Sequence, residues 1–507
     1  MVLLPDLDAF TAVYESGRPQ VVWTTLIADL ETPVSAMLKL AAGRPNSFLL
    51  ESVERGATRG RYSFIGVDPD LIWRCFGDRA EVNRVALSDP TAFEPTGEPT
   101  LASLRTLIAQ SAIDGIPEEL PPMAAGLFGY MGYDTVRLAE KLPDTHPDTL
   151  GIPDGIFLRP TVIAIFDNVD DVVTIVTPVR PSPGLGAGTA HAQARGRLDG
   201  VIAGFERPLP HQTGSLDTPV AEPVSNMTRE DFHAMVAKGK EYIFAGDIFQ
   251  VVLSQRLRVP FRLPPFALYR ALRRTNPSPF LFYLEFGGFA LVGSSPEILV
   301  RLRDGRVTIR PIAGTRPRGR DSAEDKALAA ELLADPKEIS EHLMLLDLGR
   351  NDVGRVAQVG TVTVTEQMRI EYYSHVMHIV SNVEGDLAPG HDAMDALMAG
   401  FPAGTVSGAP KVRAMEIIDE LEPERRGFYA GAIGYISANG NMDTCIALRT
   451  ALVKDGEMVV QAGGGIVADS DPEMEFQESL NKAKALVRAA QEAVRLALTS
   501  TAPPATR

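Results

Sequence analysis

The order of apolar and polar residues predicts both strands and helices, without a regular strand–helix alternation. Residues 250–259, 444–453 and 458–467 have the apolar content of strands, and the last two predict a hairpin that turns at Lys454-Asp455-Gly456. Helical periodicity marks residues 229–245, 336–346, 411–420 and 472–497. This mixture predicts an α+β fold with large antiparallel sheets.

Composition changes most clearly at residues 181–224, which are rich in proline, glycine and alanine. We interpret them as a linker or surface excursion that is partly helical at 191–205. This divides the chain into an N-terminal part, residues 1–180, and a C-terminal part, residues 225–495, followed by a disordered tail at 496–507.

Two short glycine-rich segments resemble each other. GLFGYMGY begins at residue 126 and GAIGYIS at residue 431, one in each part of the chain. So short a match is only weak support for an internal duplication.

Charge and cysteine content exclude several classes of protein. The formal net charge of −16 disfavours binding to nucleic acids or anionic membranes. The two cysteines, Cys75 and Cys445, cannot form a disulfide framework and suit a reducing cytosol. The first ten residues lack the pattern of a signal peptide, and no apolar run approaches the ~18–20 residues that a membrane span needs. These features predict a cytoplasmic protein.

Carboxylates recur on two predicted helices. Asp335-Pro336 is a helix start, where Glu338 suits a capping box, and Glu341 shares the face of Glu338 without a capping role. Glu475, Glu478 and Lys482 form one stripe on the last helix, which on its own also fits a solvated face. Two helices that each offer a carboxylate fit Mg²⁺, which takes its other oxygens from water and substrate.

One predicted strand, which is rich in small residues, suggests an anion-binding site. Alternation puts Arg449 on one face with Cys445, Ala447 and Ala451, where a guanidinium has room to bind a carboxylate, although an exposed sheet face is the alternative. Gly463-Gly464-Gly465 would let the backbone approach a ligand closely.

Two further features leave their role open. On the predicted strand at 249–257, Gln250, Ser254 and Arg256 share a polar face, which would line a wet cavity or meet solvent. His378 lies among apolar residues, where a histidine is more often part of the core than an acid or base.

A series of segments in a fixed order resembles the chorismate-utilising enzyme family, from about Phe48 to Leu486. The segments are FLLESVERG, GRYSFIG, GDIFQVVLSQR, NPSPFLFYL, GSSPEILV, PIAGTRPRG, EHLMLLDLGRNDVGRV, VMHIVS, FPAGTVSGAPK, GAIGYIS, TCIALRT and QAGGGIVADSDPE. The resemblance implies two domains, with an antiparallel sheet sandwich flanked by helices. It also implies Mg²⁺ held between Glu341, Glu478 and the ring carboxylate of chorismate, with Glu338 and Glu475 behind them.

By the same resemblance, a further set of residues contacts the substrate. This set is Gly314, Thr315, Tyr429, Arg449, Gly463, Gly464, Gly465 and Lys482. Gly464 stands where the family often has alanine. Glu297 would protonate the departing C4 hydroxyl, His378 would handle protons later, and Thr405 would help to position the site.

Two positions imply which nucleophile attacks the ring. Members that add water carry a lysine base where this chain has Gln250, and a neutral amide cannot deprotonate water. Some aminodeoxychorismate synthases carry a nucleophilic lysine where this chain has Ala313. The resemblance therefore implies attack by ammonia at C2, giving anthranilate and pyruvate, with an aminodeoxychorismate synthase component I as the alternative.

An N-terminal motif implies regulation by tryptophan. Leu49-Leu50-Glu51-Ser52 resembles the tryptophan-binding element of anthranilate-forming members, and its partner is the segment 276–281 with Pro279, Phe280 and Leu281. Tyr-Met is usual where this chain has Phe280-Leu281. The resemblance also implies a separate glutaminase subunit, in a heterodimer or heterotetramer, because neither cysteine lies on the glycine-flanked turn that glutamine hydrolysis uses.

Overall fold

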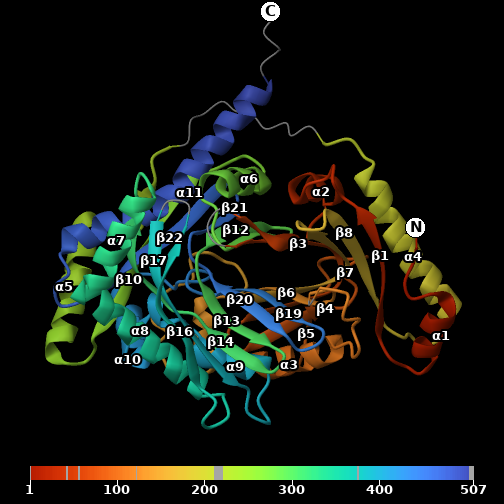
Figure 1. The fold of residues 1–507 in the computed structure, drawn as a ribbon, viewed down its shortest axis with the longest axis horizontal. Coiled ribbons are helices and arrows are strands. Elements are labelled where there is room, and N and C mark those ends of the chain that lie inside the picture. The colour runs from red at the N-terminus through yellow and green to blue at the C-terminus, as the bar shows by residue number, and fades with distance from the viewer. Residues whose placement is uncertain are drawn as a thin grey trace, which may run out of the picture.

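The computed structural model describes residues 2–41, 44–54, 58–121, 123–210, 221–373 and 376–501. Its strands form two antiparallel layers with helices on the outside (Figure 1). This confirms the predicted α+β class and the sheet sandwich. In the part of the chain that is described, no helix is both long and apolar enough to cross a bilayer.

The first layer begins in the N-terminal part and ends in the C-terminal part. Its order is β1 (Gln20–Ile27), β8 (Val172–Val179), β7 (Gly155–Asp167), β3 (Thr58–Phe76), β2 (Ser47–Glu54), β11 (Phe280–Glu285), β12 (Phe289–Ser295), β21 (Thr450–Lys454), β22 (Glu457–Ile466) and β10 (Gln250–Pro260), with β9 (Val224–Ser225) and β18 (Gly408–Ala409) beside β10.

The second layer shares the long strands β3 and β7 with the first. Its other members are β5 (Glu94–Pro95), β4 (Arg79–Asn83), β6 (Gly126–Met131), β19 (Ala432–Ser437), β20 (Met442–Ile446), β13 (Ile298–Arg303), β14 (Arg306–Ile309), β17 (Val376–Asp386), β15 (Ile312–Pro317) and β16 (Thr363–Tyr372). β14 and β15 pair along one edge of β17, and β16 pairs along the other.

The main core fills the space between the layers. Phe48 of β2 stacks on Phe128 of β6 at a ring distance of 4.4 Å, and Phe64 of β3 meets the edge of Tyr435 of β19. One cluster of buried residues contains side chains of both parts of the chain. The N-terminal and C-terminal parts are therefore joined by shared sheets and a shared core.

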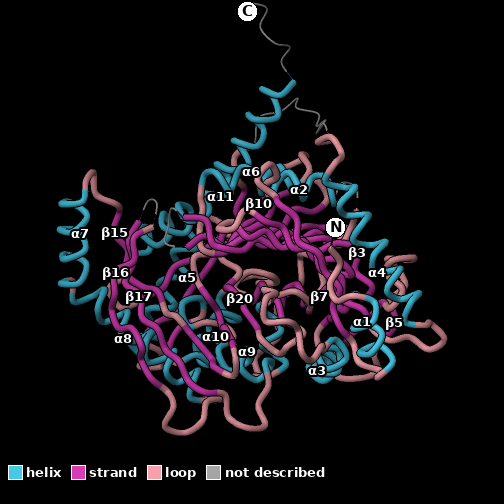
Figure 2. Tube along the Cα trace, turned by 45° about the vertical axis from the view of Figure 1, so that its right-hand side comes forward, coloured by secondary structure: helices cyan, strands magenta, loops and turns pink. Residues whose placement is uncertain are grey.

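Helices cover both outer faces (Figures 1 and 2). The first layer carries α1 (Leu7–Glu15), α2 (Pro33–Leu40), α4 (Ala187–Phe205), α6 (Pro265–Thr275) and α11 (Pro472–Thr501), with a second core beneath them. The remaining helices are α3 (Thr100–Ser111), α5 (Arg229–Ala245), α7 (Ser322–Ala334), α8 (Pro336–Gly354), α9 (Ala393–Gly400), α10 (Lys411–Leu421) and the 3₁₀ helices η1 (Tyr133–Leu138) and η2 (Gly404–Val406).

The region expected to be a linker contains the helix α4. Its buried face, including Ala190, Ala194 and Leu198, packs on β8 and on α1, so residues 187–205 belong to the folded N-terminal part. Residues 211–220 lie outside the described residues. Helix α11 continues to Thr501, so the expected tail begins later than residue 496, and residues 502–507 lie outside the described residues.

The two similar glycine-rich segments are neighbours in space. They form β6 and β19, which pair antiparallel with Gly129 opposite Gly434. A Cβ on either glycine would lie about 2 Å from a backbone oxygen of the next strand, 1.9 Å for Gly129 and 2.0 Å for Gly434. The shared sequence therefore reflects the same close strand packing on the two sides of one strand pair.

Candidate active site

The predicted metal-binding residues, Gln250 and the glycine triplet lie where the first residues of β10 meet the end of β22 and the helices α8 and α11. Gln250, the first residue of β10, is buried and pairs with Ala409, while Val251 pairs with Ile466. The Gln250 amide nitrogen donates to Glu341 Oε1 of α8 at 3.3 Å. This contact links the strand to the carboxylates.

Four carboxylates from two helices face this strand end. Burial raises the pKa of Glu341, and the charges of Glu338 and Glu478 raise it further, which places all three near one another. Burial also raises the pKa of Glu475, with Glu478 again adding to the rise. Lys482 is the near cation, with its Nζ at 2.8 Å from Glu478 Oε1.

The helix start at Asp335 is confirmed, but the role of Glu338 differs from a capping box. Asp335 accepts hydrogen bonds from the N–H groups of Lys337 and Glu338. The Glu338 carboxylate instead pairs with Arg316 Nη1 at 3.0 Å. Arg316, which directly follows Gly314-Thr315, thus holds Glu338 beside the site.

The carboxylates fit a hard cation. Among the described residues, no three His, Cys, Asp or Glu side chains lie close enough to hold a metal on their own. Glu341 and Glu478 offer only oxygen donors, and the charge of Glu478 raises the pKa of Glu341. Mg²⁺ needs only one or two protein carboxylates, so these residues suit it.

The glycine triplet is closely packed, and at Gly463 the neighbouring atom is backbone, which leaves no room for a side chain. A Cβ on Gly463 would lie 2.1 Å from the Leu253 carbonyl oxygen, and one on Gly465 would lie 2.3 Å from Gln250 Nε2. A Cβ on Gly464 would meet Glu475 Oε2 at 2.8 Å, so helix α11 also packs closely on this glycine. The Gly463 carbonyl accepts from Lys482 Nζ at 2.9 Å.

Arg449 lies in this region, but the expected strand face is wrong. The strand breaks between β20 and β21, and Arg449 has a φ of 47°, so it does not alternate with Cys445, Ala447 and Ala451. Burial lowers the pKa of its guanidinium, which has no hydrogen-bond or ion-pair partner among the described residues. A desolvated cation of this kind favours binding an anion.

His378 on β17 is held in one orientation. Its Nδ1 lies 3.1 Å from the Gly314 carbonyl oxygen and 3.0 Å from Thr315 Oγ1. A carbonyl oxygen only accepts, so Nδ1 carries the hydrogen and the Nε2 lone pair is left as a base. Burial, with a smaller contribution from the nearby Arg449 charge, lowers the pKa of His378 to about 4, so the ring is neutral at pH 7.

Glu297 is a buried acid that stays protonated. It sits between β12 and β13 with 6% of its surface exposed, and burial raises its pKa to about 8. The nearby Thr405 hydroxyl and the Ile312 N–H only partly oppose this rise. At pH 7 the carboxyl group is therefore mostly neutral and can donate a proton.

Tyr429 is fixed by a buried arginine that sequence reasoning missed. Burial raises the pKa of Tyr429 to about 12, and its hydroxyl faces the Gly463 N–H. Arg426 lies 5.4 Å from its ring centroid and pairs with Glu422, which also accepts from the Ser254 hydroxyl. The polar face of β10 thus meets a buried hydrogen-bond network. The signal in the sequence that could have indicated this network was the spacing of Arg426, four residues after Glu422.

The N-terminal motif lies one strand away from this site. Ser52 of β2 is opposite Phe280 of β11, which on its other side is opposite Ser295 of β12, two residues before Glu297. Glu51, next to Ser52, is buried and accepts from Arg273 Nε at 2.6 Å and from the Tyr269 hydroxyl. Its charge is therefore satisfied by α6, and the neighbouring Ser52 is half-buried.

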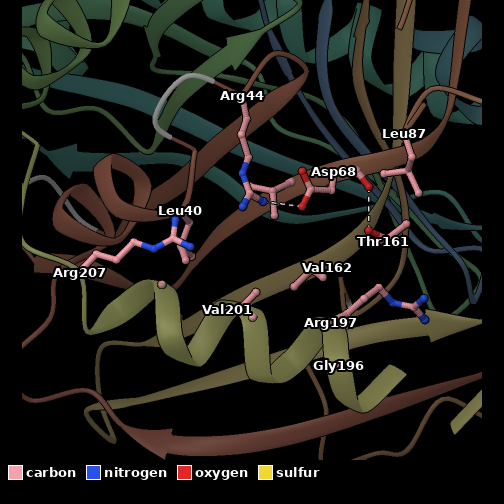
Figure 3. A pocket seen from close by; sticks show the side chains of 13 residues that line it. Leu40, Arg44, Asp68, Leu87, Thr161, Val162, Gly196, Arg197, Val201 and Arg207 are labelled. Carbon is pink, nitrogen blue, oxygen red and sulfur yellow. Dashed lines mark hydrogen bonds and ion pairs between the residues drawn. The ribbon is translucent and has the colours of Figure 1, made fainter. Parts of the chain in front are cut away.

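A cavity of about 300 Å³ lies elsewhere (Figure 3). It opens between α4 and the strands β3 and β7, and Arg44, Arg197 and Arg207 lie along its walls. Arg44 is paired with Asp68, and Arg197 donates to Thr177. None of the predicted catalytic or substrate residues lines this cavity, so we do not assign it to the reaction.

Curated relatives cover nearly the whole chain. "Anthranilate synthase component 1" of Cereibacter sphaeroides is 58% identical over 491 residues, which is 97% of this chain and 98% of that protein. The protein of the same name from Thermus thermophilus is 49% identical and covers 92% and 97%.

Solved structures agree with the fold. Anthranilate synthase component I from Streptococcus pneumoniae superposes with a TM-score of 0.74 at 38% identity, over 85% of this chain and 92% of that one. The menaquinone-specific isochorismate synthase of Escherichia coli shares the fold with a TM-score of 0.70 at 20% identity, over 95% and 100%. The model of the chorismate binding enzyme family matches residues 66–488, and the chain therefore belongs to that family.

Proposed function

We propose that this chain is the synthase subunit that makes anthranilate and pyruvate from chorismate and ammonia. The observation that supports the proposal most is the presence of charged groups of both signs among the predicted site residues. The acidic pair Glu341 and Glu478 suits a metal-bound ring carboxylate, while Arg449 offers the second carboxylate of chorismate a guanidinium that has no partner among the described residues. The relatives named anthranilate synthase component 1 support the same reaction.

The residues divide the work between binding and proton transfer. Mg²⁺, held by Glu341 and Glu478, would neutralise the ring carboxylate and draw electron density from the ring. Arg449, Tyr429 and the N–H groups of Gly463–Gly465 would hold the enolpyruvyl side, and Gly314-Thr315 and Lys482 would border the ring.

Proton transfer follows from the protonation states of two residues. Glu297 is neutral at pH 7 and gives its proton to the departing C4 hydroxyl as ammonia adds at C2. The substituted ring then loses a ring proton and pyruvate, and becomes aromatic. His378, neutral with its Nε2 lone pair available, is suited to handle that proton, and Thr405 lies beside Glu297 to orient it.

The lining of the site favours ammonia over other nucleophiles. Gln250 is a neutral amide whose nitrogen already donates to Glu341, so it cannot act as a base toward water. Ala313 has no nucleophilic atom, which argues against the lysine-type aminodeoxychorismate synthase alternative.

We expect the purified chain to form anthranilate with ammonium salts and not with glutamine. Glutamine hydrolysis of this type needs a reactive thiolate, but Cys75 and Cys445 are buried and burial raises the pKa of both thiols well above the usual value. Because ammonium predominates over ammonia at neutral pH, the initial rate with ammonium should climb with pH from 7 toward 8. Anthranilate fluorescence measures the product.

One result of the comparison between ammonium and glutamine would contradict the proposal. Anthranilate from glutamine without a second protein would refute the assignment as the synthase half alone. Adding a glutaminase subunit should restore the use of glutamine, in a heterodimer or heterotetramer in the cytoplasm.

We also propose that tryptophan binds at Ser52 together with Pro279, Phe280 and Leu281 and inhibits the enzyme. Ser52→Phe should raise the tryptophan concentration for half inhibition at least about tenfold, equivalent to about 1.4 kcal/mol of lost binding, because an aromatic ring would occupy the inhibitor's place. The inhibition curve is measured with chorismate and ammonium. Ser47→Ala, a buried serine of the same strand, is the control. An unchanged curve for Ser52→Phe would place the tryptophan site elsewhere.

A further inference from the structure

A small cavity of about 20 Å³ lies next to Glu297, within the cover of α8 and α9. Three polar side chains border it: Glu297, Thr405 and Asp352. The other walls are the apolar or glycine residues Ile298, Leu299, Ile309, Pro311, Leu345, Leu348, Gly349, Gly400, Ala403 and Gly404. Its volume exceeds the roughly 10–15 Å³ that one water molecule needs, and three polar neighbours are enough to hold it.

Asp352 is not part of the proposed mechanism, yet it is buried in this wall. Lys411 Nζ of α10 lies 2.9 Å from both of its carboxylate oxygens, and only 5% of the Asp352 side chain and 11% of the Lys411 side chain are exposed. Burial raises the pKa of Asp352, while the Lys411 charge opposes that rise. The pair places a charged hydrogen-bond acceptor at the wall of the cavity that Glu297 also borders.

The proposed reaction requires a proton to return to Glu297. When the C4–O bond breaks, its electron pair stays with the hydroxyl oxygen, which takes the Glu297 proton and leaves as water. Ammonia becomes a C2-bound ammonium group and releases one proton to the medium. Glu297 is then a carboxylate with only 6% of its surface exposed, so one proton must reach it through the protein before the next turnover.

We propose that a water molecule in this cavity, anchored by Asp352, returns the proton to Glu297. The inference rests on the proposed role of Glu297 as the acid. The water donates one hydrogen to the Asp352 carboxylate and passes its other proton to the Glu297 carboxylate, while a proton from solvent replaces the one it gave. The Asp352–Lys411 pair is thus a positioning element that acts through this water.

Gly349 offers a test that narrows the cavity without harming the fold. It lies in the interior of α8 and borders the cavity, and a Cβ there would contact Ile309 Cγ2 at 3.5 Å and Pro311 at 3.8 Å, which are ordinary contacts. An alanine also suits a helix interior better than glycine does. Gly349→Ala therefore adds a methyl group to the apolar wall of the cavity and leaves less room for the water, and its Tm should equal or exceed that of the original chain.

We expect Gly349→Ala to lower kcat about tenfold, a part of the roughly 10²–10⁴ that a positioned acid contributes, with the KM for chorismate unchanged. The solvent deuterium isotope effect on kcat should grow, because the return of the proton becomes slow. Gly354→Ala, on the same helix with nothing within 4 Å of the added Cβ, is the matched control and should keep the original kcat and isotope effect.

Two outcomes separate this inference from the proposed function. If Gly349→Ala keeps the original kcat and isotope effect while Glu297→Gln is inactive, the proposal that a water returns the proton is wrong, but the role of Glu297 as the acid is supported. If Glu297→Gln keeps its activity, Glu297 is not the acid, and the proposed return of a proton through the water is wrong as well.

Discussion

Replacing Glu297 by glutamine is expected to lower kcat for anthranilate formation by roughly 10²–10⁴, the contribution of a positioned general acid. Glutamine keeps the size of the side chain and adds no charge to the buried site, so the KM for chorismate and the Tm should change little. Steady-state kinetics with ammonium and a thermal unfolding curve give both readings. Glu285→Gln, another glutamate whose pKa burial raises, is the control.

The same residue gives the reaction an upper pH limit. The raised pKa of about 8 keeps the Glu297 carboxyl protonated below pH 8, and the acid form is lost as the pH rises through that value. The rate per molecule of free ammonia should therefore fall above about pH 8, even though the supply of ammonia grows. A rate per free ammonia that stays level from pH 7 to 10 would contradict the assignment.

Glu341→Gln and Glu478→Gln are each expected to lower the rate by roughly 10²–10³, or about 3–4 kcal/mol of transition-state stabilisation. Each removes one of the two proposed protein ligands of Mg²⁺. A Mg²⁺ titration of the rate should show half-activation at a higher concentration in both variants.

The control for this pair lies on the same helix. Glu473→Gln removes a carboxylate of α11 that pairs with Arg229 and His233 instead of the site, and should leave the Mg²⁺ curve unchanged. Near-normal rates at low Mg²⁺ for the Glu341 and Glu478 variants would remove both residues from the metal.

Local patterns predicted local structure well. The turn Lys454-Asp455-Gly456 closes the β21–β22 hairpin as expected, with Asp455 and Gly456 both at positive φ. Helix α5 begins and ends as predicted, because Thr228 and Asp231 form a capping box and Gly246 ends it in the left-handed region. Each of these signals lies within a few consecutive residues, so the local sequence alone is enough to predict it.

Signals that depend on tertiary packing were missed. Helix α8 runs to Gly354 instead of 346, because its later turns gain stability from packing on β14–β17 and not from the apolar run alone. The break at Arg449 depends on backbone contacts of Ala447 with Gly431 and of Arg449 with Ser294, which no periodicity records. Arg316 was overlooked for the same reason, since its partners Glu331, Asp335 and Glu338 come later in the chain. Arg426 pairs locally with Glu422, but its bonds to the carbonyl oxygens of Val252 and Val406 depend on tertiary packing.

The candidate site drew on both kinds of signal. Spacing alone paired Glu341 with Glu338 and Glu478 with Glu475 on their helices. That the two helices face each other came from the resemblance, and the effect of the Glu478 charge on α11, which raises the pKa of Glu341 on α8, agrees with it. The roles of Ser52 and its partner segment stay predictions, although β2 and β11 are adjacent.

The sharing of sheets between the two parts has a consequence for biosynthesis. A ribosome that has made only the N-terminal part has released β2 and β6, but their partners β11 and β19 have not yet been translated. Both strands then present an unpaired edge, the kind of surface on which chains aggregate. Pairing between strands that are far apart in the sequence is also slow. The edges of β2 and β6 therefore stay exposed until β11 and β19 have been translated and have paired with them.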